Sequence, residues 1–256
     1  MNLTTLTERP TPGTPSLATD FTAIRDLESH GLFAMPLLQP GFAVLDAGCG
    51  TGTITNGLAE MVFPGIVTAL DHSTAHLEQA RRLSQGREIV NTQFVCASAT
   101  ALPFASETFD LVFAHSLLEN LAHPETAMRE FYRVTRPGGF VAIASPDWGA
   151  LRLTPYPAEV RAAISTYRQL LESAGGHPQA GRQLGDWANR AGWVVISLGE
   201  WIEEFGQTPS IAHPLAQTLE ANGHPQLAHA LRAWAQRPDA SFHQSWKYAI
   251  GLKAEH

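Results

Sequence analysis

An apolar run that ends in closely spaced glycines, VLDAGCGTGT at residues 44–53, constrains the fold of this chain most strongly. Gly48, Gly50 and Gly52 follow a segment that we expect to be a buried strand. Glycine adopts positive φ readily and lets another group approach the backbone closely. A helix that starts after such a turn offers unpaired N–H groups to an anion. The segment therefore predicts a strand–turn–helix unit that holds the anionic end of a small molecule.

The spacing of these glycines separates two classes of cofactor. The dinucleotide fingerprint G-x-G-x-x-G needs a glycine where this chain has Thr53, so a nicotinamide-dependent oxidoreductase is the weaker alternative. Asp71 ends the next apolar segment, VTALD, about 20 residues after the glycines. A carboxylate there can accept hydrogen bonds from both hydroxyls of a ribose. The alternative is that Asp71 caps the helix that begins near Ser73.

Apolar segments alternate with helical patterns between about residues 40 and 145. The expected strands span residues 42–47, 65–70, 92–97, 110–115 and 138–145. The expected helices span residues 53–62, 73–84 and 124–135. This alternation predicts an α/β fold with a parallel sheet and helices on both faces. In such sheets the ligand lies beyond the carboxyl ends of the strands, where the strand order reverses.

The pattern changes after residue 146. Helices are expected over 156–176 and 180–193, a strand over 194–198, a helical stretch to about 238 and a last strand over 246–254. The polar, proline-rich start of the chain is typical of a loose arm. We therefore expect a single overall domain with three parts. These are a flexible N-terminal arm (1–20), a cofactor-binding core with an N-terminal lid helix (21–146), and substrate cap helices that complete the sheet (147–256).

Charge and composition narrow the class of partner. Lys and Arg number 17 against 24 Asp and Glu, a net charge of −7, without the basic stripe of nucleic-acid-binding proteins. No apolar run approaches the roughly 18 residues of a membrane helix, and no signal peptide is evident. The two cysteines indicate a reducing compartment, and the irregular histidine spacing indicates no metal site. We expect a cytoplasmic monomer or homodimer that binds a small molecule, not nucleic acid or membrane.

Four motifs in order carry a family resemblance. They are VLDAGCGTG, VTALDHS, SATALPFASETFDLVFAHSLLENL (98–121) and REFYRVTRPGGFVAIASPD (129–147). Over about residues 25–145 the chain resembles class I S-adenosylmethionine-dependent methyltransferases, especially the branch of ubiquinone and menaquinone biosynthesis. The resemblance implies a Rossmann-like, seven-stranded, mostly parallel sheet with a helical cap after the fifth strand. It also implies S-adenosyl-L-methionine as cofactor and S-adenosyl-L-homocysteine as product.

The resemblance also implies which residues bind the cofactor. They are Arg25, Asp46, Gly48, Cys49, Gly50, Gly52, Asp71, His72, Ser98, Ala99 and His115. The glycine backbone would lie against the methionine portion, Asp71 would hold the ribose, and His72 would lie beside the adenine. Ser98 stands where family members often carry aspartate, and its hydroxyl can still reach the adenine amino group. Arg25 would meet the cofactor carboxylate; the alternative is a solvated helix charge.

A sulfonium methyl is already a good electrophile, so the protein must align it with a nucleophile, exclude water and sometimes remove a proton. The candidates for a catalytic base are His115, His30 and Asp147; the alternative for His115 is a wall of the cofactor pocket. Trp148 and Tyr156 are predicted to line the acceptor pocket, unless they only pack the cap onto the sheet.

The expected reaction is in-line methyl transfer to a small, apolar, ring-containing metabolite, of a kind found in secondary metabolism. Two alternatives keep the cofactor: a rearrangement or elimination without methylation, and a ligand-sensing protein without turnover. The mass of the product separates transfer from rearrangement, because only transfer adds a methylene unit.

Overall fold

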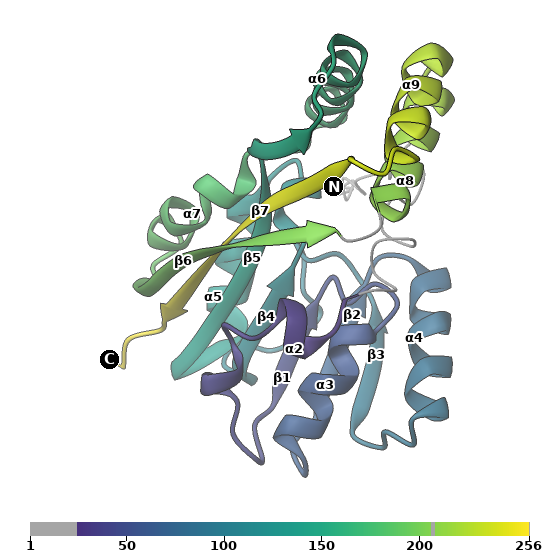
Figure 1. Ribbon diagram of the computed structural model, residues 1–256. Helices are drawn as coiled ribbons and strands as arrows, with labels where there is room; N and C mark the ends of the chain where they lie inside the picture. Colours follow the sequence, from purple (N-terminus) through teal and green to yellow (C-terminus); the bar gives the residue numbers. More distant parts are fainter. Residues whose placement is uncertain (1–24, 206–207, 256) are drawn as a thin grey trace, which may run out of the picture.

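Seven strands form one sheet in the residues that the computed structural model describes, 25–205 and 208–255 (Figure 1). The strand order is β3-β2-β1-β4-β5-β7-β6. The strands are β1 (Val44–Ala47), β2 (Val67–Asp71), β3 (Thr92–Cys96), β4 (Phe109–His115), β5 (Thr135–Thr154), β6 (Val194–Phe205) and β7 (Ser241–Leu252). The first five pair in parallel, and β7 pairs antiparallel with both β5 and β6. The predicted N-terminal arm, 1–20, lies outside the described residues.

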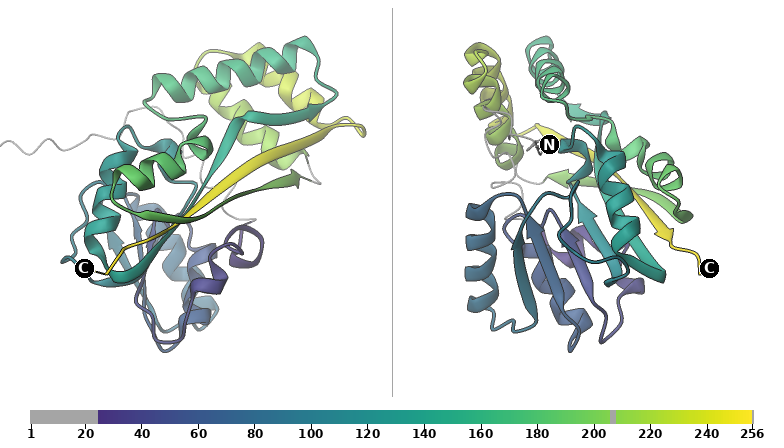
Figure 2. Two further views of the ribbon diagram at one scale, coloured as in Figure 1. Left: turned by 90° about the vertical axis from the view of Figure 1, so that its left-hand side faces the viewer. Right: turned by 180° about the vertical axis from the view of Figure 1, so that it is seen from behind.

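Helices cover both faces of this sheet (Figure 2). The α-helices are α2 (Leu27–His30), α3 (Thr53–Val62), α4 (Thr74–Gly86), α5 (Pro124–Val134), α6 (Ala158–Ser173), α7 (Leu184–Arg190), α8 (Thr208–Ala221) and α9 (Pro225–Ala235). Short 3₁₀ turns are η1 (Met35–Leu37), η2 (Leu118–Asn120) and η3 (Ala180–Arg182). Local signals explain several boundaries: the Ser73 hydroxyl accepts the His76 N–H at the start of α4, and Pro124 occupies the first turn of α5.

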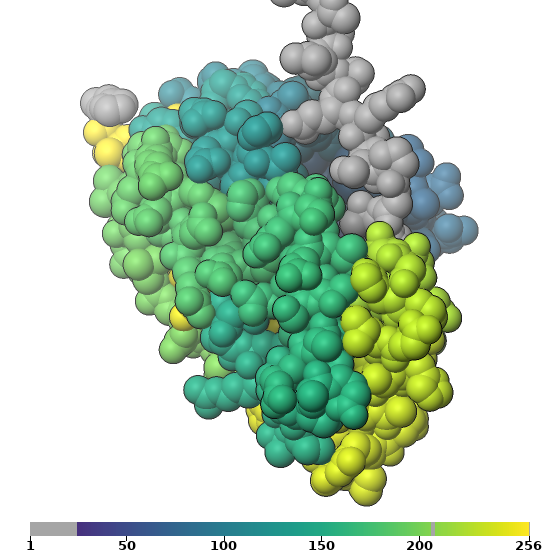
Figure 3. Space-filling view, turned by 90° about the horizontal axis from the view of Figure 1, so that it is seen from above, coloured from purple at the N-terminus to yellow at the C-terminus, as the bar shows by residue number. Residues whose placement is uncertain are grey.

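Buried apolar residues form three clusters in the described part of the chain. One packs α5 and α7 against the sheet, with Phe131 and Trp187 at its centre. A second packs α2 and α3 on the opposite face, through residues such as Leu58. The third joins α6, α8 and α9 to the far ends of β5, β6 and β7, where Phe205 and Phe242 meet. Figure 3 shows α6 and α9 side by side on this end of the molecule.

The sequence prediction of a mostly parallel, Rossmann-like sheet with helices after the fifth strand is confirmed. Chain order reverses between the neighbouring strands β1 and β4, which is where ligands bind in open α/β sheets. None of the described helices has the length and apolar character needed to cross a bilayer.

Several predicted boundaries were wrong in the second half of the chain. The predicted strands 138–145 and 194–198 were too short, because β5 continues to Thr154 and β6 to Phe205. Polar residues and Gly149 interrupt the apolar run of β5, but pairing with β7 resumes after a bulge between Asp147 and Arg152. The predicted helix 180–193 is instead the turn η3 followed by α7, and the described part of the lid helix is only the four-residue α2.

Candidate functional site

The glycine turn between β1 and α3 has the predicted left-handed backbone. Gly48, Gly50 and Gly52 have φ of +76°, +54° and +80°, a region that glycine enters at little cost. The N–H groups of Gly48 and Cys49 donate to the Leu70 carbonyl oxygen at 2.7 and 3.0 Å. A Cβ on Gly52 would lie 2.7 Å from the Cβ of Ala80. The turn is therefore fastened to the end of β2 and closely packed against α4.

Asp71 joins this turn to the tip of β2. Its carboxylate accepts the Gly50 N–H at 3.0 Å and the Ser73 N–H at 2.8 Å. Burial alone would raise the pKa of Asp71, but hydrogen bonds from His76 and from the Ser73 N–H hold that pKa below its usual range. Asp71 is therefore an ionised carboxylate at the strand tip, and the side-chain cap of α4 is Ser73 rather than Asp71.

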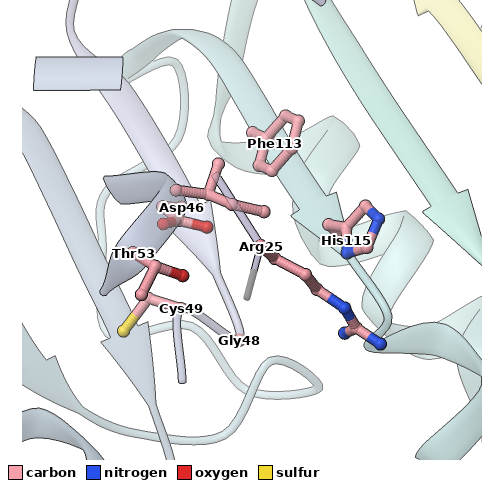
Figure 4. Close-up of a pocket in the computed structure, with 8 residues that line it drawn as sticks. Arg25, Asp46, Gly48, Cys49, Thr53, Phe113 and His115 are labelled. Carbon is pink, nitrogen blue, oxygen red and sulfur yellow. The ribbon is translucent and has the colours of Figure 1, made fainter. Parts of the chain in front are cut away.

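A pocket lies between the glycine turn and the end of β4 (Figure 4). The empty space between its lining residues is about 310 Å³, a volume that includes open solvent. Figure 4 shows the Arg25 side chain extending toward the end of β4. The lining residues are Arg25, Asp46, Gly48, Cys49, Thr53, Ile54, Phe113 and His115. Sequence reasoning named five of these eight as cofactor-binding residues: Arg25, Asp46, Gly48, Cys49 and His115.

Two charged side chains give the pocket its polarity. Burial raises the pKa of Asp46 to about 7, although a hydrogen bond from the Thr55 hydroxyl at 2.6 Å opposes the shift. Burial lowers the pKa of Arg25, while Glu203 and Glu119 raise it, and a guanidinium keeps its proton at neutral pH. Arg25 therefore places a fixed positive charge in a site whose carboxyl group, Asp46, gains or loses its proton near neutral pH.

Aromatic rings pack around His115, which lines the pocket, in a group that we call the aromatic wall. Its members are His30, Phe33, His115, Trp201, Trp246 and Tyr248. Trp246 stacks on His115 at 4.6 Å and 27°, and on Trp201 at 5.8 Å and 9°. His30 meets His115 edge-on at 5.2 Å, and the Arg25 guanidinium carbon lies 5.0 Å from the centre of the Trp246 ring. Flat faces from four separate elements thus meet beside the pocket.

His115 is the most exceptional member of the aromatic wall. It is 7% exposed, and its Nε2 has no hydrogen-bond partner within residues 25–205 and 208–255. Burial lowers its pKa well below the usual value, and the nearby Arg25 and His30 lower it further. His115 is therefore a neutral imidazole with an unsatisfied nitrogen, an arrangement that calls for a specific explanation such as a ligand.

The other base candidates already have partners for their polar atoms. His30 Nδ1 lies 2.8 Å from the Ser29 hydroxyl, and its Nε2 lies 3.1 Å from Glu203 Oε1. Buried Asp147 accepts the Gly149 N–H at 2.9 Å and the Arg182 Nε–H at 2.6 Å. Neither side chain has the unpaired atom that His115 has.

Other predicted residues lie farther from the pocket. His72 is exposed on the surface beside Asp71, and Ser98 is exposed with its hydroxyl 2.8 Å from that of Thr100, whereas Ala99 is buried. Trp148 contacts Tyr167 at 5.0 Å within the third apolar cluster. Tyr156 is 40% exposed, with the Arg161 guanidinium over its ring. The structure does not bring Trp148 or Tyr156 to the pocket lining.

Sequence reasoning named Trp201 only as one of several aromatic residues after Asp147, and it missed Glu203 and Trp246. Glu203 Oε2 accepts the Trp246 Nε1–H at 2.8 Å, and Trp201 pairs with Trp246 across β6 and β7. The available signal was the alternation in WIEEF, which places residues 201 and 203 on one face of an extended strand. That signal shows that the two residues share a face and does not show what the face meets.

Comparisons with known proteins agree with this geometry. The family described as "Methyltransferase domain" matches residues 45–143. The ubiquinone/menaquinone biosynthesis C-methyltransferase UbiE of Burkholderia cenocepacia is 31% identical over 216 residues, covering 72% of this chain and 88% of the relative. The solved structure of a putative methyltransferase from Bacillus halodurans has a TM-score of 0.65 at 19% identity, covering 88% and 98% of the two chains.

A solved neighbour with bound ligands bears on the cofactor. Phosphoethanolamine N-methyltransferase 2 of Haemonchus contortus, in complex with phosphomonomethylethanolamine and S-adenosylhomocysteine, has a TM-score of 0.58 at 18% identity. The match covers 88% of this chain and 51% of that one. Together with the family match, it confirms the cofactor class that the four motifs predicted.

Proposed function

Because this chain belongs to the class I S-adenosylmethionine-dependent methyltransferases, we propose that it transfers a methyl group in line to a small, mainly apolar, ring-containing acceptor. The protein is an enzyme that uses S-adenosyl-L-methionine as its methyl donor. The observation that carries the proposal for the acceptor is the aromatic wall, which packs against His115 at the edge of the pocket.

The residues around the pocket suit the chemistry of the cofactor. The left-handed turn at Gly48–Gly52 leaves bare backbone beside the pocket, ionised Asp71 is a ribose acceptor, and Arg25 offers a cation to a carboxylate. Asp46, which lines the same pocket, completes the polar surface. When bound, the cofactor supplies an electrophilic methyl group. The protein's own part is to hold it, exclude water and present the acceptor.

The acceptor would lie against the aromatic wall. Indole and phenyl faces favour flat rings, which they bind in offset or edge-on contact at low conformational cost. The segment after Asp147 would cover this region. Trp148 and Tyr156 stay predicted acceptor contacts, and an acceptor would have to extend beyond the pocket lining to touch them. The fixed guanidinium of Arg25 over Trp246 adds a positive charge beside these rings.

His115 would accept a proton from the acceptor where the reaction releases one. Its low pKa leaves it unprotonated near neutral pH, and its Nε2 is free to accept. His30 and Asp147, the other predicted bases, use their polar atoms within the protein. Protonation of His115 should not lower kcat between pH 8 and about pH 6, because its pKa lies below the usual imidazole value of about 6.5. The profile is measured in Asp46→Asn protein, because Asp46 in the same pocket titrates near pH 7. A loss of kcat centred near pH 6.5 would contradict this.

The decisive experiment uses the purified protein with methyl-labelled cofactor and a metabolite extract. A product heavier by one methylene unit, with release of S-adenosyl-L-homocysteine, supports the proposal. A product of unchanged mass would favour a rearrangement instead.

Calorimetry with S-adenosyl-L-homocysteine tests the cofactor residues separately. Asp71→Ala should weaken binding at least about 10-fold, since hydrogen bonds to a charged group contribute about 1.5–3 kcal/mol. Asp186→Ala, at an exposed position on α7, is the matched control. Equal affinity of the two variants would remove Asp71 from the site.

A further inference from the structure

We propose that Glu203 is a positioning residue for methyl transfer, because its carboxylate fixes two of the rings that hold His115 in place. Oε1 lies 3.1 Å from His30 Nε2, and Oε2 accepts the Trp246 Nε1–H at 2.8 Å. His30 and Trp246 are in turn the two nearest ring neighbours of His115, edge-on at 5.2 Å and stacked at 4.6 Å. One side chain on β6 thus holds both rings against the imidazole at the end of β4.

His115 depends on these contacts to an unusual degree. A catalytic histidine is normally oriented by a hydrogen bond to one of its ring nitrogens. Here Nε2 is buried without a partner in the described part of the chain. Ring packing by His30 and Trp246 therefore contributes to the orientation of the imidazole. The third ring beside it, Trp201 at 6.4 Å, itself stacks on Trp246, so it also follows the position of the ring that Glu203 holds.

The placement of Glu203 suits this role. Its side chain is 17% exposed, and it lies on β6 two residues from Trp201, on the same face of the strand. Two carboxylate oxygens with one donor each leave little freedom for the side chain. Charged hydrogen bonds of this kind are also stronger than neutral ones. Glu203 therefore joins α2, β6 and β7 at the point where they meet the end of β4.

This inference rests on the proposed function, since it takes His115 to be the group that meets the acceptor. It differs from a purely structural role in one respect. A structural role would act on stability or on cofactor affinity, whereas a positioning role acts through His115. Glu203 lies outside the residues that line the cofactor pocket, but it raises the pKa of Arg25, which does line it. The affinity for S-adenosyl-L-homocysteine is therefore measured for each Glu203 variant, and the kinetic comparison is made at saturating cofactor.

The first test needs no acceptor. In wild-type protein with labelled histidine, the His115 ring protons should be shifted upfield by the stacked indole, and the His115→Gln variant identifies them. Glu203→Ala should move these signals toward the values of a free imidazole. Glu204→Ala, at the neighbouring exposed position on β6, should leave them in place. Unchanged His115 signals in Glu203→Ala would overturn the proposal.

Glu203→Asp, which carries a shorter acidic side chain, is a second variant in case Glu203→Ala does not fold. Glu203→Asp keeps the charge but lacks one methylene group, so its carboxylate cannot keep both contacts. It should shift the His115 signals part of the way. If Glu203→Ala fails to fold and Glu203→Asp leaves the signals unchanged, the proposal is equally refuted.

A double-mutant cycle supplies the kinetic test once an acceptor is known. Glu203→Ala should lower kcat about 10- to 100-fold in the wild-type background, the range expected for a misplaced reacting group. In the His115→Gln background it should lower kcat by less than about threefold, because the two residues act as a unit. Equal losses in both backgrounds would show that Glu203 does not act through His115. Failure of wild-type protein to methylate any acceptor would refute the proposed function, while the spectroscopic result would stand by itself.

Discussion

Replacing Gly52 with alanine should lower the free energy of unfolding by about 2–5 kcal/mol. The backbone at Gly52 has φ +80°, and an L-residue in the left-handed region costs about 1–2 kcal/mol. The new Cβ would also lie 2.7 Å from the Cβ of Ala80 and 3.1 Å from its Cα. Neither atom can rotate away, because both are fixed by the backbone of α4. Overpacking of this kind costs about 1–3 kcal/mol.

Two other glycines separate these contributions. Gly41 has φ +92° but no atom within 4 Å of the position that a Cβ would take, so Gly41→Ala should cost only about 1–2 kcal/mol. Gly86 has open space and no left-handed φ, so alanine there should be neutral or stabilise the helix by up to about 1 kcal/mol. Urea unfolding followed by circular dichroism measures all three variants. If Gly52→Ala loses no more stability than Gly41→Ala, the turn is not packed against α4 as described.

Two further predictions concern buried ionisable groups. Burial raises the pKa of Asp46 from 3.8 to about 7, so between these values the folded state keeps a proton that the unfolded state has lost. The resulting stability is fully present below about pH 4 and falls by up to about 4 kcal/mol as the pH rises to 7. In urea unfolding, the free energy of unfolding of Asp46→Asn should therefore change less with pH than that of the wild type. An equal pH dependence in the two proteins would refute this. Lys253 Nζ donates to the carbonyl oxygens of Thr135 and Tyr132 at 2.7 and 3.0 Å, so Lys253→Met should cost about 2–3 kcal/mol. A loss below about 1 kcal/mol in chemical unfolding would show that these bonds add little.

The first half of the fold could be predicted because its signals are local. The helix predicted over 53–62 has those bounds in the structure, and the predicted strand 92–97 differs from β3 by one residue. The strand β5 could not be bounded in this way. Its extension past residue 145 contains Pro146, Asp147 and Gly149, which break the apolar pattern, and its hydrogen-bond partner is β7, about a hundred residues later. Strand pairing over such a separation leaves little trace in the local sequence.

The site also has one part that local sequence predicts and one part that depends on contacts between distant segments. The positive φ values at Gly48, Gly50 and Gly52 follow from one short segment, and the structure confirms them. His30 and His115 could each be named as candidates, but their contact could not, since 85 residues separate them and the sheet order brings them together. That a carboxylate from β6 contacts both His30 and Trp246 is visible only once β6 and β7 are in register.

The two parts of the site lie on different strands, so substitutions can change one part without the other. The glycine turn and Asp71 belong to the parallel strands β1 and β2, whose register also fixes the core. Three members of the aromatic wall, Trp201, Trp246 and Tyr248, come instead from β6 and β7, the last two strands at the edge of the sheet. On β6, alternate residues face the wall, so substitutions at positions such as Trp201 can reshape the proposed acceptor surface without moving the turn that we propose to hold the cofactor. Variants of Trp201 should therefore alter the choice of acceptor while S-adenosyl-L-homocysteine affinity stays constant. Coupled changes in both would mean that the cofactor pocket and the wall are one rigid unit.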